Sequence, residues 1–165
     1  MSAIHSLKSI QRLPVSMEQA WAFFSDPRNL QALTPSFLNL RPTNEVWGDE
    51  VYPGQVMTYT VKPLLGIPLE WMTVITQVER NKFFIDEQRK GPYRLWHHQH
   101  HFKLIDGGVE MTDLVHYRLP MGIIGQMLHQ PLVRKKLEEI FLYRYSRIQD
   151  LFGVWKDESP LIQIN

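Results

Sequence analysis

Four residues that could carry out proton chemistry lie close together in this sequence. His98 and His100 alternate along one run with the period of a β-strand, and Asp113 and Tyr117 alternate along the next such run. Because alternate residues of a strand share a face, the members of each pair point the same way. A carboxylate that fixes one imidazole tautomer, beside a second imidazole that donates or removes a proton, could promote enolisation, dehydration or aldol cyclisation. His98, His100 and Asp113 are therefore the candidate catalytic residues.

The same residues have other interpretations. In the simplest, they only satisfy one another's hydrogen bonds in the buried wall of a cavity, with Asp113 bonded to His100 and His98 bonded to Tyr117. They could also orient a ligand by hydrogen bonds. As a third possibility, His98 and His100 could present two ligands to zinc or copper, with Asp113 as another. The sequence lacks the His-Glu-x-x-His signature of a metal hydrolase, so we expect no metal and no other cofactor.

Asp86 and Gln88 share a face with Phe84 on another strand-like run. If that face points inward, Asp86 needs a partner, or burial will raise the pKa of its carboxyl group. If it lies at an edge, Asp86 is solvated or forms an ion pair across to the neighbouring strand.

The elements that must position these residues are mostly strands. Six runs rich in Val, Thr, Tyr, Trp and Phe alternate with a period of two. Short turn signals separate them, which favours an antiparallel meander. Asp106-Gly107-Gly108 is a strong hairpin signal, and it would bring Asp113 within a pair or two of His100. The six runs are Phe37–Trp47, Gln55–Lys62, Leu69–Arg80, Phe83–Arg89, Leu95–Ile105 and Val109–Leu119.

The N-terminal segment begins with a strand pattern and continues with helix signals. Residues 3–12 have the pattern of an edge strand. Ser16 and Gln19 have the spacing of a capping box, and Asp26-Pro27 ends the helix that follows. A second short helix is expected over 28–33.

The C-terminal third has helical periodicity. Apolar residues recur at intervals of three and four, which predicts a helix from about 121 to 152. Because such a helix would be about 48 Å long, we expect Pro131 to kink or divide it. The stretch 154–165 has no clear pattern. We therefore expect one ligand-binding domain over 1–153, followed by a C-terminal tail.

This order of elements predicts an α+β fold. A curved antiparallel sheet of about six or seven strands would wrap a long C-terminal helix, with two short helices after the first strand. Because sheets twist and curl, a straight helix cannot touch a concave sheet everywhere, and the gap becomes a pocket. The predicted ligand-binding residues are Tyr59, Trp71, Asp86, Trp96, His98, His100, Phe102, Asp113, Tyr117, Ile124 and Met127.

Composition excludes several classes of protein. The chain has 165 residues, which is the size of one domain, and its 18 Lys and Arg against 17 Asp and Glu argue against a nucleic-acid binder. The absence of cysteine rules out disulfide scaffolds and thiol catalysis. No apolar run reaches the roughly 18 residues of a membrane span, and no apolar leader is visible. We expect a cytoplasmic protein without an integral membrane segment.

A small basic cluster lies in the predicted C-terminal helix. Arg134, Lys135 and Lys136 are adjacent, with Arg144 and Arg147 further along. The neighbouring glutamates favour a solvated helix face. A transient contact with an anionic membrane surface is the alternative.

Three stretches resemble one protein superfamily. The string from Ser16 to Leu30 resembles the opening helices of START-like (SRPBCC) proteins, which include START lipid carriers, birch-pollen-allergen-like proteins and polyketide cyclases. The pattern Trp-x-His-x-His-x-Phe over 96–102, followed by Thr-Asp-x-Val-x-Tyr-x-x-Pro over 112–120, resembles one subgroup of mostly unassigned function. Residues 140–144 resemble the closing helix of that subgroup. The resemblance implies a helix-grip fold with an apolar cavity, but no single reaction.

The function expected from the residues and the resemblance is the binding or carriage of a small hydrophobic molecule. A lipid, isoprenoid, quinone or polyketide-like compound would fit a cavity between sheet and helix. One alternative is a cyclase or dehydratase that uses the same His, Asp and Tyr residues. Another is a module that acts through its surface, which would have a filled core and an exposed interaction patch. The sequence does not predict the oligomeric state.

Overall fold

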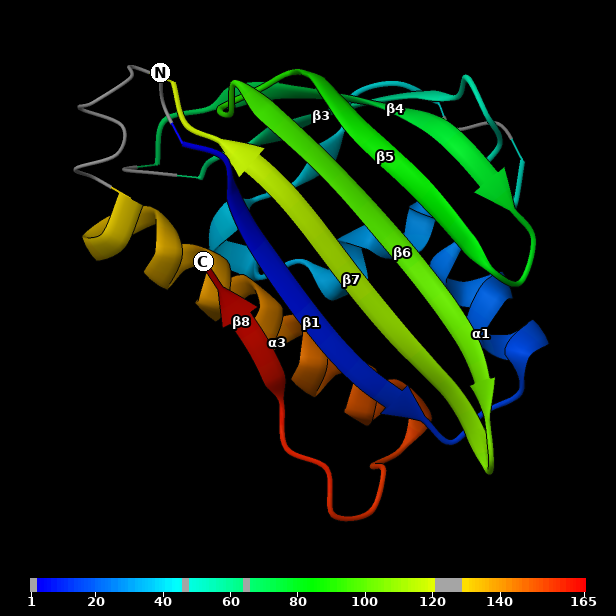
Figure 1. Cartoon of the computed structure of the whole chain (residues 1–165). Coiled ribbons are helices and arrows are strands. Elements are labelled where there is room, and N and C mark those ends of the chain that lie inside the picture. Colours follow the sequence, from blue (N-terminus) through cyan, green and yellow to red (C-terminus); the bar gives the residue numbers. More distant parts are fainter. Residues whose placement is uncertain (1–2, 46–47, 64–65, 121–128) are drawn as a thin grey trace.

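The structure is a computed structural model, and it describes residues 3–45, 48–63, 66–120 and 129–165. These residues form an eight-stranded antiparallel sheet in the order β2-β3-β4-β5-β6-β7-β1-β8. The predicted α+β fold with one curved antiparallel sheet is confirmed, with eight strands instead of six or seven (Figure 1). The strands are β1 (His5–Leu13), β2 (Arg41–Pro42), β3 (Val56–Val61), β4 (Leu69–Glu79), β5 (Phe83–Lys90), β6 (Leu95–Ile105), β7 (Gly108–Arg118) and β8 (Leu161–Ile164).

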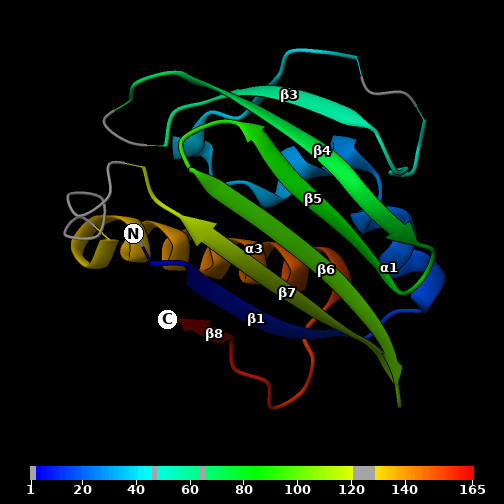
Figure 2. The same ribbon diagram turned by 45° about the horizontal axis from the view of Figure 1, so that its top comes forward.

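The helices pack on the concave side of this sheet. The long helix α3 (Lys135–Phe152) crosses the sheet, which curves around it (Figure 2). The helix α1 (Met17–Phe24) and the 3-10 helices η1 (Pro27–Leu33) and η2 (Ser36–Leu38) lie behind the sheet in Figure 1, on the same side as α3.

The helix signals of the N-terminal segment are confirmed, but the strand predicted there as an edge strand, β1, is an inner strand that pairs with β7 on one side and β8 on the other. The Ser16 side chain accepts a hydrogen bond from Gln19 N at 3.2 Å, and the Gln19 side chain accepts one from Ser16 N at 3.0 Å. This reciprocal capping box starts α1. The Asp26 carboxylate accepts from Arg28 N at 3.0 Å and caps η1 in the same way.

The β6–β7 hairpin forms as predicted, and the structure supplies the register, which the sequence had placed only to within a pair or two. His100 lies opposite Asp113, and Trp96 lies opposite Tyr117. Gly107 in the turn has a φ of 82°, a left-handed conformation that glycine adopts without steric cost. The turn signal and the alternating pattern therefore placed these four side chains on the concave face.

The strand predicted over Phe37–Trp47 is wrong for most of its length. The chain forms η2 there, and then only the two-residue strand β2. Asn39 ends η2 in the left-handed region with a φ of 46°, which interrupts an extended chain. Pro42 has no backbone N–H to donate, which is tolerated here because β2 is an edge strand. Residues 46 and 47 lie outside the described residues.

The C-terminal third differs from the prediction at both ends. A π-helical segment, η3 (His129–Arg134), contains Pro131 and precedes α3, so the helix changes its geometry at the proline. Residues 121–128 lie outside the described residues. The stretch without a clear sequence pattern contains β8, which pairs with β1 through residues 161–164. Four residues are too few for a periodic signal, although Ile164 is buried.

Two hydrophobic clusters form the core. One joins α1 to β3, β5 and β6 around Trp21, Phe24 and Phe102. The other joins α3 to β6, β7 and β1 around Trp96 and Phe141. None of the helices in the described part of the chain has the length and the apolar composition needed to cross a membrane.

Candidate functional site

A cavity of about 220 Å³ lies between the two core clusters. Its walls come from the concave face of β3 to β6, from η1 and from α3. Most of the lining side chains are apolar or aromatic. They include Leu30, Leu33, Met57, Val61, Trp71, Ile75, Phe84, Tyr93, Trp96, Leu137 and Phe141.

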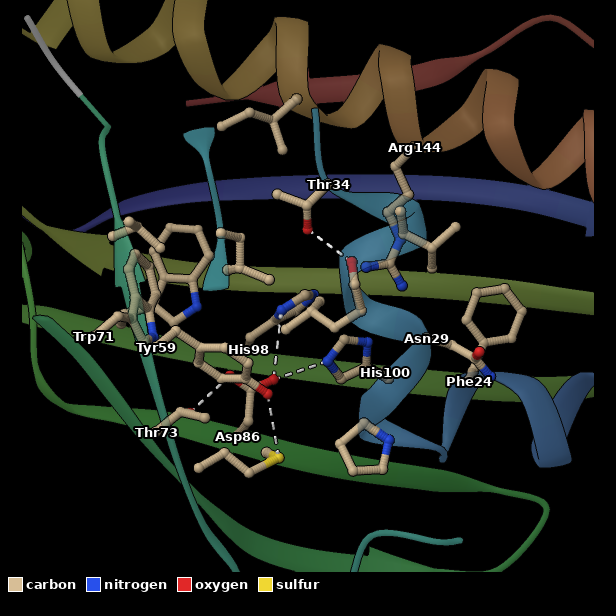
Figure 3. Close-up of a pocket in the computed structure, with 18 of the residues that line it drawn as sticks. Phe24, Asn29, Thr34, Tyr59, Trp71, Thr73, Asp86, His98, His100 and Arg144 are labelled. Atoms are coloured by element: carbon tan, nitrogen blue, oxygen red, sulfur yellow. Dashed lines mark hydrogen bonds and ion pairs between the residues drawn. The ribbon is translucent and has the colours of Figure 1, made fainter. Parts of the chain in front are cut away.

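A polar cluster from β5 and β6 interrupts this apolar lining (Figure 3). Asp86 Oδ2 lies 2.8 Å from His100 Nε2 and 3.6 Å from His98 Nδ1. The two imidazoles are two residues apart on one strand face, and their ring centroids are 3.8 Å apart. The donor atoms of all three residues lie within 4.8 Å of one another. The Asp86 carboxylate therefore makes a hydrogen bond with His100 and an ion-pair contact with His98.

Asp113 on β7 lies on the opposite side of the imidazoles from Asp86. Its Oδ1 atom is 3.0 Å from His98 Nε2, with hydrogen-bond geometry. The same oxygen is 2.9 Å from His100 Nδ1, an ion-pair distance that lies off the direction of a hydrogen bond. Each imidazole thus lies between the same two carboxylates.

Arg144 on α3 completes the charge balance. Its Nε atom is 3.4 Å from Asp113 Oδ2, and its side chain extends from the helix into the cavity (Figure 3). The guanidinium lies 5.7 Å from the centre of the Phe24 ring. Within the described part of the chain, Arg144 Nε makes an ion pair with Asp113 but no hydrogen bond, and the buried guanidinium carries a fixed positive charge.

Burial is the largest influence on the pKa of both carboxyl groups and would raise each pKa. For Asp86, the hydrogen bond with His100 and the two imidazoles outweigh burial, so the pKa is lowered. For Asp113, the Arg144 guanidinium and the two imidazoles hold the pKa well below its usual range. Both carboxyl groups are therefore ionised at neutral pH.

The two histidines respond differently to the same burial. For His98, burial and the charge of His100 lower the pKa. For His100, burial would also lower the pKa, but Asp113 and Asp86 together raise it. His100 is therefore the imidazole of the two that takes up a proton first, and its ring stacks on Phe84 with centroids 4.1 Å apart. Neutral His98 donates from Nε2 to Asp113, which leaves a lone pair on Nδ1.

Two further polar groups adjoin the cluster. Thr73 Oγ1 on β4 lies 3.3 Å from Asp86 Oδ1, so the hydroxyl orients the carboxylate. The Tyr59 hydroxyl on β3 lies 3.5 Å from Met57 Sδ. Burial, with a smaller contribution from Asp86, raises the pKa of Tyr59 to about 12, so the phenol stays protonated and can donate.

The predicted ligand-binding residues divide into three groups. Six of them line the cavity: Tyr59, Trp71, Asp86, Trp96, His98 and His100. Three are buried elsewhere: Phe102 packs on Trp21 and Phe24, Asp113 lies behind the histidines, and Tyr117 packs in the second core cluster. The remaining two, Ile124 and Met127, lie outside the described residues.

The predicted pairings within the cluster are partly exchanged. His98, not His100, makes the hydrogen bond with Asp113, and Asp86 is the hydrogen-bond partner of His100. Asp86 therefore points inward and has a partner, which was one of its two interpretations. The alternation of residues along each strand predicted which side chains face the cavity. Which carboxylate bonds to which histidine depends on the stagger of β5, β6 and β7.

Arg144 is the buried cation of the cavity lining that the sequence analysis missed, as it also missed Asn29 and Thr34 in that lining. We expected Arg144 on a solvated helix face, whereas it is only 9% exposed. A signal was present, because Arg144 follows Phe141 by three positions and precedes Ile148 by four. It therefore lies on the apolar stripe of the helix.

Comparisons with known proteins identify the fold. No protein-family model matches the chain, and no curated protein sequence matches it. Protein CV1439 from Chromobacterium violaceum is similar in structure, with a TM-score of 0.68 at 9% identity over 91% of this chain and 98% of that one. Protein Ms6760 from Mycobacterium smegmatis has a TM-score of 0.61 at 18% identity, over 88% and 89%. Ara h 8.0201 has a TM-score of 0.55 at 15% identity, over 90% and 99%.

Proposed function

This chain has the helix-grip fold of START-like (SRPBCC) proteins, and we propose that it binds a small hydrophobic molecule with one polar end. One observation carries the proposal: a mostly apolar cavity of about 220 Å³ has the cluster of Asp86, His98 and His100 in its wall. The ligand class is a lipid, isoprenoid, quinone or polyketide-like compound.

The apolar body of the ligand would contribute most of the affinity. Burial of apolar surface is favourable by about 25 cal/mol per Å², so about 200 Å² of buried ligand surface would contribute about 5 kcal/mol. Aromatic side chains give the cavity stiff walls, because Trp71 packs edge-on against Trp96 with centroids 5.4 Å apart. Met57 adds a wall that adapts to ligand shape.

The polar cluster would set the orientation of the ligand. The lone pair on His98 Nδ1 can accept a hydrogen bond from a ligand hydroxyl, and the Arg144 guanidinium can donate to a carbonyl oxygen. A compound with neighbouring hydroxyl and carbonyl groups would use both. When His100 is protonated, the charges of the cluster balance, since the two carboxylates then face two cations, Arg144 and His100. A neutral ligand then adds no unpaired charge.

A cyclase or dehydratase is the second candidate function. The observation in its favour is the contact of His98 with Asp113, which holds a neutral imidazole in one tautomer beside the cavity. Such an imidazole can remove a proton from carbon next to a carbonyl group. Under this alternative, His98→Ala and Asp113→Asn lower the turnover rate and retain ligand affinity. A carrier would lose affinity or be unaffected. The presence of a cavity disfavours a module that acts only through its surface.

Native mass spectrometry of freshly purified, untagged protein tests the binding proposal. Extra mass that is present in the native spectrum and leaves on denaturation would support it, and the released compound would identify the ligand class. The same protein is then titrated with an apolar fluorescent probe, with emission of Trp71 and Trp96 as the second signal. A protein that carries no extra mass and binds no probe in this cavity would refute the proposal.

A further inference from the structure

We propose that Asp86, His98 and His100 form a binding site for one divalent transition-metal ion, with its open coordination positions facing the cavity. This inference goes beyond the binding of a hydrophobic molecule and does not depend on it. From the sequence we expected no metal, and the site considered there had Asp113 as the third ligand. The proposed site has Asp86 in that place.

The donor atoms are close to the spacing of a coordination sphere, since all three lie within 4.8 Å of one another. His98 Nδ1 and His100 Nε2 lie 3.6 Å and 2.8 Å from the same oxygen, Asp86 Oδ2. Ligands that are each about 2.1 Å from an ion lie about 3.0 to 3.4 Å apart. Small side-chain adjustments would therefore place one ion in contact with all three residues. Two imidazoles and one carboxylate on one side of an ion leave its other positions open.

The outer atoms of the proposed ligands are already held. The imidazole nitrogens that point away from Asp86 both lie close to Asp113 Oδ1, at 3.0 Å for His98 and 2.9 Å for His100. A carboxylate hydrogen-bonded behind a metal-binding imidazole fixes its tautomer and ring orientation, as Asp113 does for His98, and the same oxygen is a close charged neighbour of His100 Nδ1. Asp86 is oriented by Thr73, which lies at its other carboxylate oxygen. The sheet thus orients every proposed ligand before an ion arrives.

Burial and access are also consistent with a metal site. His98 and His100 are 7% and 6% exposed, yet they and Asp86 line the cavity. The open positions of the ion would therefore face the cavity, where a ligand oxygen or water can enter. The two other histidines of β6, His97 and His101, are on the opposite face and are partly exposed.

Charge indicates the chemistry of the fourth ligand. Histidines bind metals as neutral imidazoles. A divalent ion, the two carboxylates of Asp86 and Asp113 and the Arg144 guanidinium then leave one net positive charge. An anionic oxygen donor, such as hydroxide, carboxylate or enolate, would neutralise it. Imidazole and carboxylate donors suit zinc, iron(II), cobalt or nickel, whereas calcium and magnesium prefer oxygen ligands alone.

Cobalt(II) titration of chelator-treated protein is the direct test. Visible absorption reports coordination, and metal analysis after gel filtration reports the number of ions retained. We expect one cobalt ion per chain, displaced by zinc. Asp86→Asn keeps the shape of the side chain but removes the anionic ligand, so binding should weaken by at least about tenfold, and Asp113→Asn should weaken it by about tenfold through the histidines.

The matched controls use histidines of the same strand that face away from the cavity. His97 lies 3.0 Å from Glu87 and beside His116, with ring centroids 6.4 Å apart, so this face could bind an ion adventitiously. His97→Ala and His101→Ala should retain the cobalt site. Binding that disappears in His97→Ala and persists in Asp86→Asn would overturn the proposal, as would a wild-type protein that retains no cobalt.

A spectroscopic measurement on wild-type protein avoids the risk that a variant fails to fold. Pulsed electron paramagnetic resonance of the copper(II)-loaded chain should detect two bound imidazoles. One imidazole or none would overturn the proposal. Probe binding to the metal-free protein is measured separately. Its loss would count against the proposed function, while loss of cobalt binding alone would count only against the metal site.

Discussion

The Nε atom of Arg144 on α3 lies 3.4 Å from Oδ2 of Asp113 on β7, and both residues are buried beside the cavity. This ion pair connects the long helix to the sheet. It also balances the carboxylate that contacts both histidines. If Arg144 lay on the solvated face of α3, as the sequence predicted, Asp113 would have no cationic partner on that helix.

Arg144→Met should destabilise the protein strongly, because it leaves a buried carboxylate with one fewer positive partner. We expect a loss of about 3 kcal/mol in the free energy of unfolding, measured by urea denaturation. The control is Arg147→Met on the same helix, where the pair with Asp150 is largely solvated and the change should stay within about 0.5 kcal/mol. Equal losses in the two variants would contradict the role assigned to Arg144.

Ile140→Trp should fill part of the cavity and weaken binding of an apolar fluorescent probe. Ile140 is half-buried and lines the cavity, whereas Leu142 is exposed, at 43%. We expect about tenfold weaker binding in Ile140→Trp and unchanged binding in Leu142→Trp. The two variants add the same ring to the same helix. If both bind as wild type, the probe does not occupy this cavity.

Asp26→Ala should remove the cap of η1 and a pH-dependent contribution to stability. The hydrogen bond with Arg28 lowers the pKa of Asp26, so the folded state favours the ionised carboxylate. Its contribution is present at neutral pH and is lost as the pH falls through the lowered pKa, below about 4. The variant should lose about 1 kcal/mol at pH 7.

Urea denaturation of wild type and Asp26→Ala at a series of pH values checks this sign. The difference between the two proteins should shrink as the pH falls, over the range in which both remain folded. A difference that grows in acid would mean that Asp26 is not stabilised in its ionised form.

Gly108→Ala should disturb the sheet more than Gly107→Ala. A β-carbon on Gly108 would overlap the backbone carbonyl oxygen of Leu13, so the backbone of β1 or β7 must move. Gly107 has a φ of 82° and its nearest contact would be 3.4 Å away, at the Trp155 ring, so alanine there should cost about 1 to 2 kcal/mol in conformational strain. Thermal unfolding of the two variants gives the order, and a smaller loss for Gly108→Ala would be inconsistent with the close approach.

The local signals of the sequence determined much of the fold. The capping box at Ser16 and the turn at Asp106-Gly107-Gly108 involve only residues that are close in sequence, so the sequence alone predicts them. Together with strict alternation, the turn was enough to put Asp113 within a pair or two of His100, and the assembled hairpin places the two residues opposite each other. The family resemblance rested on the same alternating run of β6 and β7.

Contacts between distant segments decided the rest. The position of Asp86 opposite His98 depends on the stagger of β5 against β6, and the position of Thr73 beside Asp86 depends on β4 against β5, where β-bulges interrupt the register. The pairing of β8 with β1 joins segments about 150 residues apart. The burial of Arg144 depends on which stripe of α3 faces the sheet. Alternation along a strand determines a face by local geometry, whereas the partner across the sheet is determined only when the whole sheet assembles.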